Sequence, residues 1–299
     1  AILRYGKEKA FSEGKDVKNI KLVKSLGEKV IKGKYGNLFE MYEKITDQNP
    51  YKTPMMIYPA VHYTMGGLWV DYNLMTSIPG CYSIGESNFS DHGANRLGAS
   101  ALMQGLADGY FVLPYTIGDY LANEIRTGPI DTKSQEFELA EKKVNSLINK
   151  LLKNKGSEPV DYFHKKLGKI MWNKCGMSRN RTELEEAIVE IRALKAEFEK
   201  NVYVPGSCSE YNEELAKAGR VADFIELGEL FAMDALAREE SCGGHFREEH
   251  KTKEGEALRR DDDFSFVSAW EFLNEKSSHK LHKEMLKFEN IEVKTRSYK

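Results

Sequence analysis

The chain has 299 residues, of which 41% are hydrophobic and 30% charged, as is typical of a globular protein long enough for two domains. Its 44 basic and 46 acidic residues give a net charge of −2, so no overall basic excess predicts nucleic-acid binding. No run of about 18 apolar residues is present, which argues against a helix that crosses a membrane.

Residues 1–49 are predicted to be helical. Two groups of apolar residues recur at helical spacing and predict two helices: Ile20, Val23, Leu26 and Val30, then Leu38, Met41, Tyr42 and Ile45. Residues 47–50, Asp-Gln-Asn-Pro, end the second helix, because proline and the polar residues before it favour a turn.

Residues 62–102 contrast with the charged segments on either side. The stretch is rich in glycine, and Arg96 is its only Lys or Arg. Alternating residues at 68–72 and a compact run at 81–84 predict two short strands, the second ending at Gly85-Glu86. Residues 99–111 have helical spacing without proline and predict a helix, and a second apolar segment follows it.

The remaining residues are predicted to form a helical bundle. Thr127-Gly-Pro129 is a chain breaker that ends the preceding domain. Four segments with helical period follow it: 131–152, 160–175, 182–200 and 213–237. Thr182 and Glu185 have the spacing of a capping box for the third helix. Four helices joined by short loops make a bundle, and residues 264–299 are expected to hold a strand and a helix.

Three features of the glycine-rich stretch indicate a ligand site. A carboxylate at the carboxyl end of a strand, here Glu86, can accept a hydrogen bond from a cofactor hydroxyl. The N-terminus of the helix that starts near Ala99 favours an anion. Arg96 stands alone in a neutral stretch, which is consistent with an anionic partner or with a structural ion pair.

Cysteines and histidines do not predict a metal site in this chain. The cysteines are far apart and form no CxxC pair: Cys81, Cys175, Cys208 and Cys242. His245 and His250 are five residues apart, which is the wrong spacing for one face of a helix. Neither a signal peptide nor a lipidation motif is visible at the N-terminus, and we therefore expect a cytoplasmic location.

Several blocks of the sequence resemble one enzyme family. HYTMGG at residues 62–67, GE at 85–86 and HGANRLGASAL at 92–102 resemble, in order and spacing, the flavoprotein subunit of succinate dehydrogenase and fumarate reductase. Residues 240–245, ESCGGH, followed by RRDD at 259–262, are similar to that family's Glu-Ser-Arg-Gly-Ala-His and Arg-Asp-Asp segments. The resemblance covers nearly the whole chain, which looks like roughly the C-terminal half of such a subunit.

The resemblance implies a role for each residue of the blocks. His62 and Arg96 would bind a carboxylate of succinate or fumarate and act in catalysis, and Glu86 would bind the ribityl chain of FAD. The other residues assigned to the cofactor lie in the same blocks: Gly66, Gly67, Asn95, Ser100, Ala101 and Leu102. The backbone of the last three would face the flavin pyrimidine ring.

The chain also departs from the family pattern. It contains no GxGxxG after a strand, so the site for the FAD adenosine and pyrophosphate is missing. The histidine that usually carries covalent flavin and the proton-delivering arginine of the capping domain are missing too. Cys242 and Ala101 stand where relatives often carry Arg and Ser, and residues 251–257 look like an insertion.

The expected fold is α/β followed by all-α, and helix-rich overall. Residues 1–60 would be the remainder of a capping domain that closes over the substrate. Residues 61–128 would be the C-terminal part of a Rossmann-like FAD-binding domain. Residues 129–250 would form the helical bundle domain and residues 251–299 a small C-terminal region.

The implied function is part of an oxidoreductase that interconverts succinate and fumarate by hydride transfer to or from FAD. Electrons would pass to an iron–sulfur subunit and quinone, with a membrane cytochrome b subunit in the same complex. The chain would be peripheral, on the cytoplasmic side of the inner membrane, and inactive by itself. Two alternatives stay open: a soluble flavoenzyme like L-aspartate oxidase, and a non-catalytic helical interaction module with a vestigial flavin fold.

Overall fold

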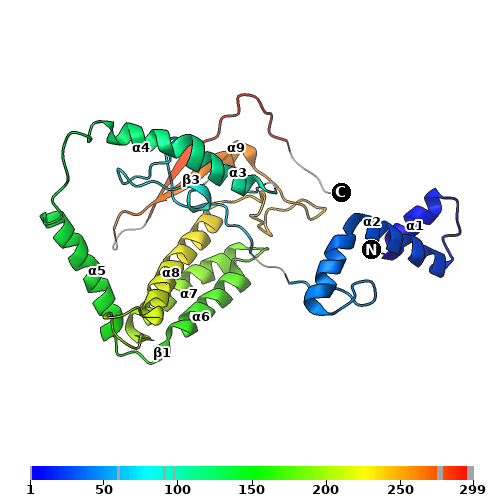
Figure 1. Ribbon diagram of the computed structural model, residues 1–299, viewed down its shortest axis with the longest axis horizontal. Coiled ribbons are helices and arrows are strands. Elements are labelled where there is room, and N and C mark those ends of the chain that lie inside the picture. The colour runs from blue at the N-terminus through cyan, green and yellow to red at the C-terminus, as the bar shows by residue number, and fades with distance from the viewer. Residues whose placement is uncertain (1, 59–60, 90–91, 97, 275–278, 295–299) are drawn as a thin grey trace. The chain divides into compact units, whose positions relative to one another are not determined.

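The computed structural model describes residues 2–58, 61–89, 92–96, 98–274 and 279–294 (Figure 1). The chain divides into two compact units, Ala1–His62 and Tyr63–Lys299, and each is described by itself. Within the described ranges, no helix combines the length and the apolar character that a membrane crossing requires. The boundaries predicted near residues 128 and 250 lie inside the second unit and stay predictions.

The first unit is a pair of packed helices, α1 (Ile2–Ser12) and α2 (Ile20–Thr46). Its small core contains Ala10, Val23 and Leu26. The two helix backbones come into close contact at Gly6 and Gly27. Glycine is required at both positions, because a side chain there would collide with the backbone of the opposite helix.

The prediction of two separate helices in this unit's second part was wrong, because α2 runs unbroken through both apolar groups. Asn19 caps its start by accepting a hydrogen bond from the N–H of Leu22 at 3.1 Å. No proline interrupts residues 20–46, and isolated glycines weaken a helix without ending it. The predicted end is confirmed at Asp47, which adopts a left-handed conformation with φ 56°.

The two strands predicted at 68–72 and 81–84 are absent from the described segment 61–89, which holds only two isolated bridges, Leu68 to Asn88 and Met75 to Tyr82. Side chains compete with the strand pairing that was expected. Asp71 Oδ1 accepts hydrogen bonds from the N–H groups of Asn73 at 2.8 Å and Met75 at 3.0 Å, which bends the chain into a turn.

Helical structure follows this segment as predicted. Helix α3 (Ser100–Ala107) passes through a π-helical turn, η2 (Asp108–Val112), into α4 (Leu113–Ala122). The helix predicted at 99–111 is therefore confirmed, and the apolar segment after it is helical too. Pro114 lies in the first turn of α4, the part of a helix where proline is tolerated best.

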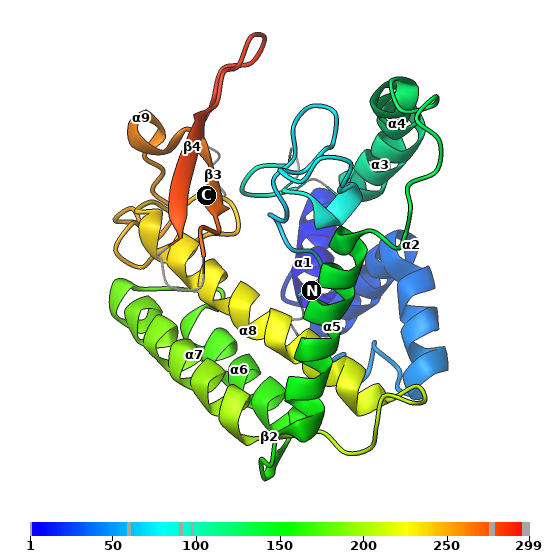
Figure 2. The ribbon, with the colours of Figure 1, turned by 90° about the vertical axis from the view of Figure 1, so that its left-hand side faces the viewer.

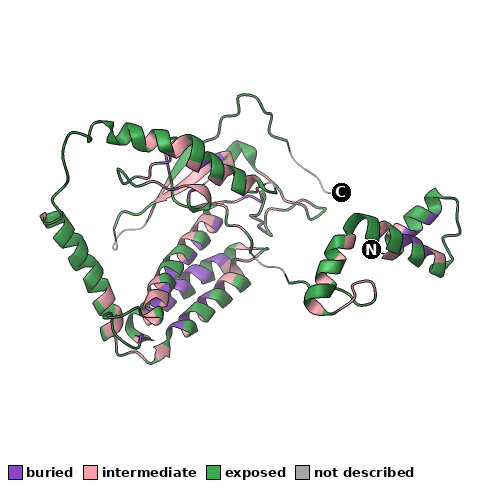
Figure 3. Ribbon diagram, in the orientation of Figure 1, coloured by how far each residue is buried: buried purple, intermediate pink, exposed green. Residues whose placement is uncertain are grey.

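The bundle core consists of three helices packed side by side, α6 (Val160–Lys174), α7 (Arg181–Asn201) and α8 (Glu213–Ala237) (Figures 1 and 2). Figure 3 shows that the buried residues gather on these helices. They include Phe163, Leu184 and Ile191, each fully buried.

The fourth predicted bundle helix, α5 (Gln135–Lys153), has no buried residue and contributes to the core only near its C-terminal end, through Leu151 and Leu152. Its apolar stripe remains exposed, as at Leu139 and Leu147. The prediction that four helices share the core was therefore wrong, because apolar periodicity does not show that a helix is buried.

The capping box predicted at Thr182 was also wrong. The N-cap of α7 is Asn180, whose side-chain oxygen accepts a hydrogen bond from the N–H of Glu183 at 2.9 Å. The Glu183 carboxylate in turn accepts from Asn180 Nδ2 at 2.6 Å. The helix therefore begins two residues earlier than predicted, with asparagine as the cap instead of threonine, and Glu183 bonds the side chain of the cap and not its backbone N–H as in a capping box.

Short strands complete the second unit. β1 (Glu158–Pro159) pairs in parallel with β2 (Val202–Tyr203), and β3 (Phe266–Glu271) pairs antiparallel with β4 (Lys280–Met285). A short helix, α9 (Asp261–Phe264), precedes β3. The strand expected after residue 264 is confirmed, whereas no helix follows it among residues 279–294, and 295–299 lie outside the description.

Hydrogen bonds join this hairpin to the C-terminal end of α8. Trp270 Nε1 donates to Asp234 Oδ1 at 2.9 Å, and the Arg238 guanidinium donates to the carbonyl oxygens of Phe264 and Phe266 at 3.1 and 2.9 Å. The fold is helix-rich as predicted, and the hairpin is anchored to the bundle.

Candidate functional site

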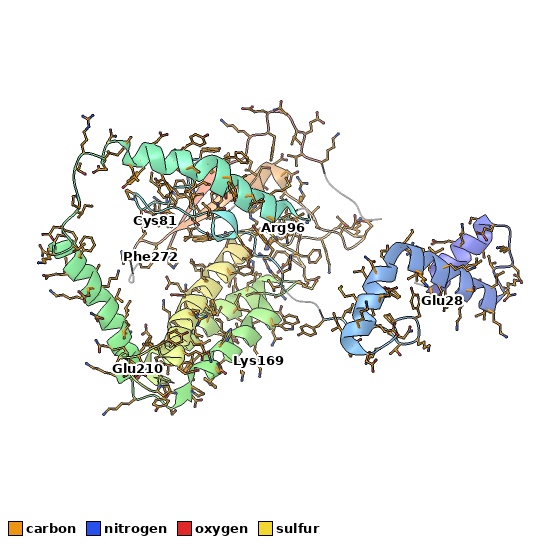
Figure 4. The ribbon with its side chains drawn as sticks, viewed as in Figure 1. Glu28, Cys81, Arg96, Lys169, Glu210 and Phe272 are labelled. Carbon is orange, nitrogen blue, oxygen red and sulfur yellow. The ribbon has the colours of Figure 1, made fainter. Side chains whose placement is uncertain are left out.

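The segment around Tyr63 contacts the loop that carries Arg96. The Arg96 guanidinium carbon lies 4.5 Å from the centroid of the Tyr63 ring, and the same ring meets His92 edge-on at 5.7 Å between centroids. A cation over an aromatic face is attracted electrostatically by the ring, which fixes the plane of the guanidinium. Arg96 is labelled in Figure 4, on the side of the second unit where α3 lies.

The next residue, Thr64, contacts the block that carries Glu86. The N–H of Thr64 donates to Glu86 Oε1 at 3.1 Å. Glu86 does not follow a strand, as was predicted, but lies exposed in a single 3₁₀ turn, η1 (Gly85–Ser87). Its other carboxylate oxygen has no hydrogen-bond partner within the described ranges, so it can accept from a ligand hydroxyl.

A buried polar network fixes this turn against α3. Asp108 Oδ2 accepts from the N–H of Gly85 at 2.9 Å and from Asn88 Nδ2 at 3.4 Å, and Asn88 Oδ1 accepts from Gln104 Nε2 at 3.1 Å. Asn88 and Asp108 are 2% and 8% exposed. Sequence reasoning missed this network, although a lone acid in the apolar run 99–111 was a signal that a polar partner faces that helix.

The first turn of α3 presents backbone N–H groups without a side-chain cap. Ala99, the N-cap residue, has a left-handed conformation with φ 67° and makes no side-chain cap bond. Ser100, Ala101 and Leu102 form the first turn, where N–H groups have no acceptor within the helix. Because these groups carry part of the positive end of the helix dipole, this turn suits an acceptor-rich or anionic ligand edge.

The predicted glycines have structural reasons for their identity. Gly66 has φ 109°, a conformation that side chains disfavour. A Cβ at Gly67 would lie 2.5 Å from the carbonyl oxygens of Ser87 and Asn88, where the chain pairs through the N–H of Leu68. These glycines thus bring residues 63–68 against the Glu86 turn.

The two remaining predicted residues are exposed. Asn95 lies in the Arg96 loop. His62 is the last residue of the first unit, so its position is described apart from that of Arg96. The structure therefore brings together the surroundings of Glu86 and Arg96 within the second unit, and the pairing of His62 with Arg96 stays a prediction.

A second contact with the Arg96 loop comes from the far end of the sequence. The N–H of Gly244 donates to the carbonyl oxygen of Ala94 at 2.8 Å. Sequence reasoning noticed the block 240–245 as a family resemblance but gave it no contact with the site. No periodicity could have shown it, because it joins segments distant in the chain.

His245 in this block is an uncharged structural residue. Its pKa is lowered to about 4, mainly by burial and also by the neighbouring Arg179, Arg247 and Arg238, against a hydrogen bond to the Arg238 backbone that raises it. His245 Nδ1 lies 2.9 Å from Arg179 Nη1, and Nε2 lies 3.0 Å from the carbonyl oxygen of Arg238. Since a guanidinium only donates and a carbonyl only accepts, the proton of the neutral ring is on Nε2.

Comparison with known proteins identifies the family of the chain. Residues 164–298 match the family model described as fumarate reductase flavoprotein C-term, and residues 6–102 match an FAD binding domain model. The chain belongs to the family of succinate dehydrogenase and fumarate reductase flavoprotein subunits.

Individual members of this flavoprotein family show how much of the chain is shared. The succinate dehydrogenase flavoprotein subunit of Bacillus subtilis is 32% identical over 217 residues, which is 73% of this chain and 36% of the relative. The fumarate reductase flavoprotein subunit of Haemophilus influenzae is 28% identical over 243 residues, 79% of this chain and 38% of the relative.

A solved quinol-fumarate reductase chain matches the structure with a TM-score of 0.74 and 25% identity, over 89% of this chain and 44% of that one. The chain therefore spans less than half the length of these family members. The expected fold class is confirmed by this likeness, and the resemblance seen in the sequence is confirmed by the family models.

Proposed function

We propose that this chain is the part of a flavoprotein that carries the flavin pyrimidine end and the dicarboxylate end of a site interconverting succinate and fumarate. One observation carries the proposal. The sequence blocks that mark the family meet in the structure, through Tyr63 beneath Arg96 and through Thr64 on Glu86.

The residues present fit the flavin end of FAD. The first turn of α3 offers the backbone N–H groups of Ala101 and Leu102 to the carbonyl and nitrogen edge of a pyrimidine ring. The exposed Glu86 carboxylate keeps an oxygen for a ribityl hydroxyl. Ala101 is no obstacle to this use, because the donors are backbone groups.

Bound FAD would supply the hydride acceptor and donor, and the chain's own residues would hold the substrate. Arg96 is suited to a carboxylate because its planar guanidinium offers paired donors, and the Tyr63 ring fixes the plane from one face. His62 directly precedes Tyr63 in the chain, and we assign it to the same carboxylate. Cations at the carboxylate hold the dicarboxylate in line and stabilise charge that develops when fumarate is reduced.

An exposed apolar face supports the proposal that further polypeptide completes the site. Five large apolar residues on α3, η2 and the start of α4 are more than two-thirds exposed: Leu102, Met103, Tyr110, Phe111 and Tyr115. Faces of this kind are usually covered in the functional protein. We assign the rest of the FAD-binding domain to this face.

The partners follow from the same proposal. Electrons would leave the flavin to an iron–sulfur subunit, with a membrane cytochrome b subunit and quinone beyond it, and the flavoprotein would be peripheral on the cytoplasmic side of the inner membrane. The L-aspartate oxidase alternative predicts turnover of an amino dicarboxylate instead, and the interaction-module alternative predicts no flavin.

Arg96→Ala tests the proposal in the FAD-loaded flavoprotein that contains this chain. We expect dicarboxylate turnover to be lost while most FAD binding is kept, because Arg96 holds substrate and not the flavin. The matched control is Arg126→Ala, which removes an exposed arginine outside the site. Retained turnover with unchanged substrate affinity in Arg96→Ala would refute the assignment.

A further inference from the structure

The loop that follows α8 makes a backbone contact with the loop that carries Arg96. The N–H of Gly244 donates to the carbonyl oxygen of Ala94 at 2.8 Å, and Ala94 stands two residues before Arg96. The contact joins two loops by main-chain atoms, so its strength does not depend on a flexible side chain.

Gly243 makes this approach possible. Its backbone has φ 58°, and a Cβ built on it would lie 2.3 Å from the carbonyl oxygen and 2.5 Å from the carbonyl carbon of Ala94. No side chain fits at that distance without moving Ala94. The neighbouring Gly244 has ordinary room, since its Cβ would lie 3.5 Å from Met65 Cε and 3.6 Å from the Ala94 oxygen.

The two glycines occupy a closed turn. The N–H of Cys242 donates to the carbonyl oxygen of His245 at 2.8 Å, and the N–H of His245 donates back to that of Cys242 at 3.0 Å. Ser241 is fully buried; its Oγ accepts from the N–H of Arg247 at 2.8 Å and donates to the Arg247 carbonyl oxygen at 3.1 Å.

The base of this turn is fixed to the bundle. Arg247 is 1% exposed, and its Nη1 donates to the carbonyl oxygens of Ala235 and Leu236 at 3.0 and 3.3 Å, at the C-terminal end of α8. His245 is held between Arg179 and the carbonyl of Arg238. A loop with buried, fully bonded anchors is rigid, so it can fix what rests on its tip.

We propose that residues 241–247, the 241–247 loop, are a positioning element that sets where Arg96 meets its carboxylate ligand, with Gly243 as the positioning residue. The inference rests on the proposed function, because it takes Arg96 as the dicarboxylate ligand. Paired guanidinium–carboxylate bonds depend on orientation, and a misplacement of about 1 Å can cost about 100-fold in rate. Gly243 acts through Ala94 and does not touch the substrate.

The first arm of the test measures hydrogen exchange in the full chain. The variants are Gly243→Ala and Gly243→Asn, with Gly244→Ala as the matched control in the same turn. Asparagine tolerates the left-handed backbone better than alanine but brings the same Cβ against Ala94, so it separates backbone strain from displacement. We expect faster exchange at residues 92–96 in both Gly243 variants, with unchanged protection in α6, α7 and α8.

The second arm measures ligand binding in the FAD-loaded flavoprotein that contains this chain. The dissociation constant for fumarate is read from the change in flavin absorbance, and the FAD affinity is measured separately. We expect the Gly243 variants to weaken fumarate binding by about tenfold or more, since the ligand arginine is displaced. FAD affinity should be unchanged, and Gly244→Ala should resemble the unsubstituted protein in both measurements.

Each contrary result has a distinct meaning. Equal exchange at residues 92–96 in Gly243→Ala and Gly244→Ala overturns the positioning role. Faster exchange without weaker fumarate binding also overturns it and leaves the proposed function standing, provided that Arg96→Ala still weakens fumarate binding. If Arg96→Ala leaves fumarate binding unchanged, the proposed function of Arg96 fails, and the positioning role fails with it.

Discussion

Lowering the pH from 7 to 5 should destabilise the second unit through His245. Burial lowers the pKa of this histidine to about 4, whereas an unfolded chain leaves a histidine near about 6.5. The unfolded state therefore takes up a proton below that value and the folded state does not. The contribution to stability is fully present above the unfolded pKa and is lost as the pH falls toward 4.

The size of the effect follows from the difference between the two pKa values. At about 1.4 kcal/mol per pH unit, the free energy of unfolding should fall by about 2 kcal/mol between pH 7 and pH 5, and by somewhat less because the ring is partly exposed. Burial also lowers the pKa of His250, so the whole protein will show a steeper dependence than His245 alone causes.

His245→Gln isolates the contribution. A glutamine amide can accept from Arg179 with its oxygen and donate to the Arg238 carbonyl with its nitrogen, and it does not titrate. Urea unfolding followed by circular dichroism at pH 7 and pH 5 gives the difference between the two proteins. Identical pH dependence in both, or a His245 titration by NMR near its unfolded value, would refute the reasoning.

Three further outcomes follow from particular contacts. Asn180→Ala should lower the free energy of unfolding by about 1 kcal/mol in urea melts, because it removes the α7 cap, and a larger loss in the control Thr182→Ala would contradict this. Gly67→Ala should make residues 63–89 more susceptible to limited proteolysis, because the new Cβ would lie 2.5 Å from two carbonyl oxygens. The control Gly118→Ala, which has open space around it, should not change the susceptibility. Equal resistance of the two variants would contradict the close approach at Gly67. Asp108→Ala should lower the free energy of unfolding by about 1 to 3 kcal/mol, because it leaves the N–H of Gly85 without its acceptor. The loss should be detectable as faster hydrogen exchange of the Gly85 amide, and unchanged exchange would contradict a stabilising role of the network.

Helices with strong apolar periodicity could be predicted from the sequence. The bounds of α8 match the predicted segment, and α6 differs by one residue, because buried stripes such as Phe163 and Leu167 record the packing directly. The same signal misled at α5, where an apolar stripe is exposed. Periodicity shows that a face is apolar but not whether this chain covers it.

The failures around the site have local causes. Asp71 bends the segment in which strands were expected, and Asn180 caps α7 in place of Thr182. Both cases turn on side chains that bond the backbone nearby, where short sequence patterns are ambiguous. The contact of Gly244 with Ala94 lies beyond such reasoning altogether, because it depends on how distant segments pack.

The visible absorption spectrum of FAD tests the central claim most directly. It would be recorded with the chain alone and again after addition of a polypeptide that supplies the part of the relatives' length that this chain does not span. We expect a perturbed flavin band in the completed protein that bleaches with succinate under anaerobic conditions. An unperturbed FAD spectrum in both preparations, with the polypeptides shown to associate, would contradict it.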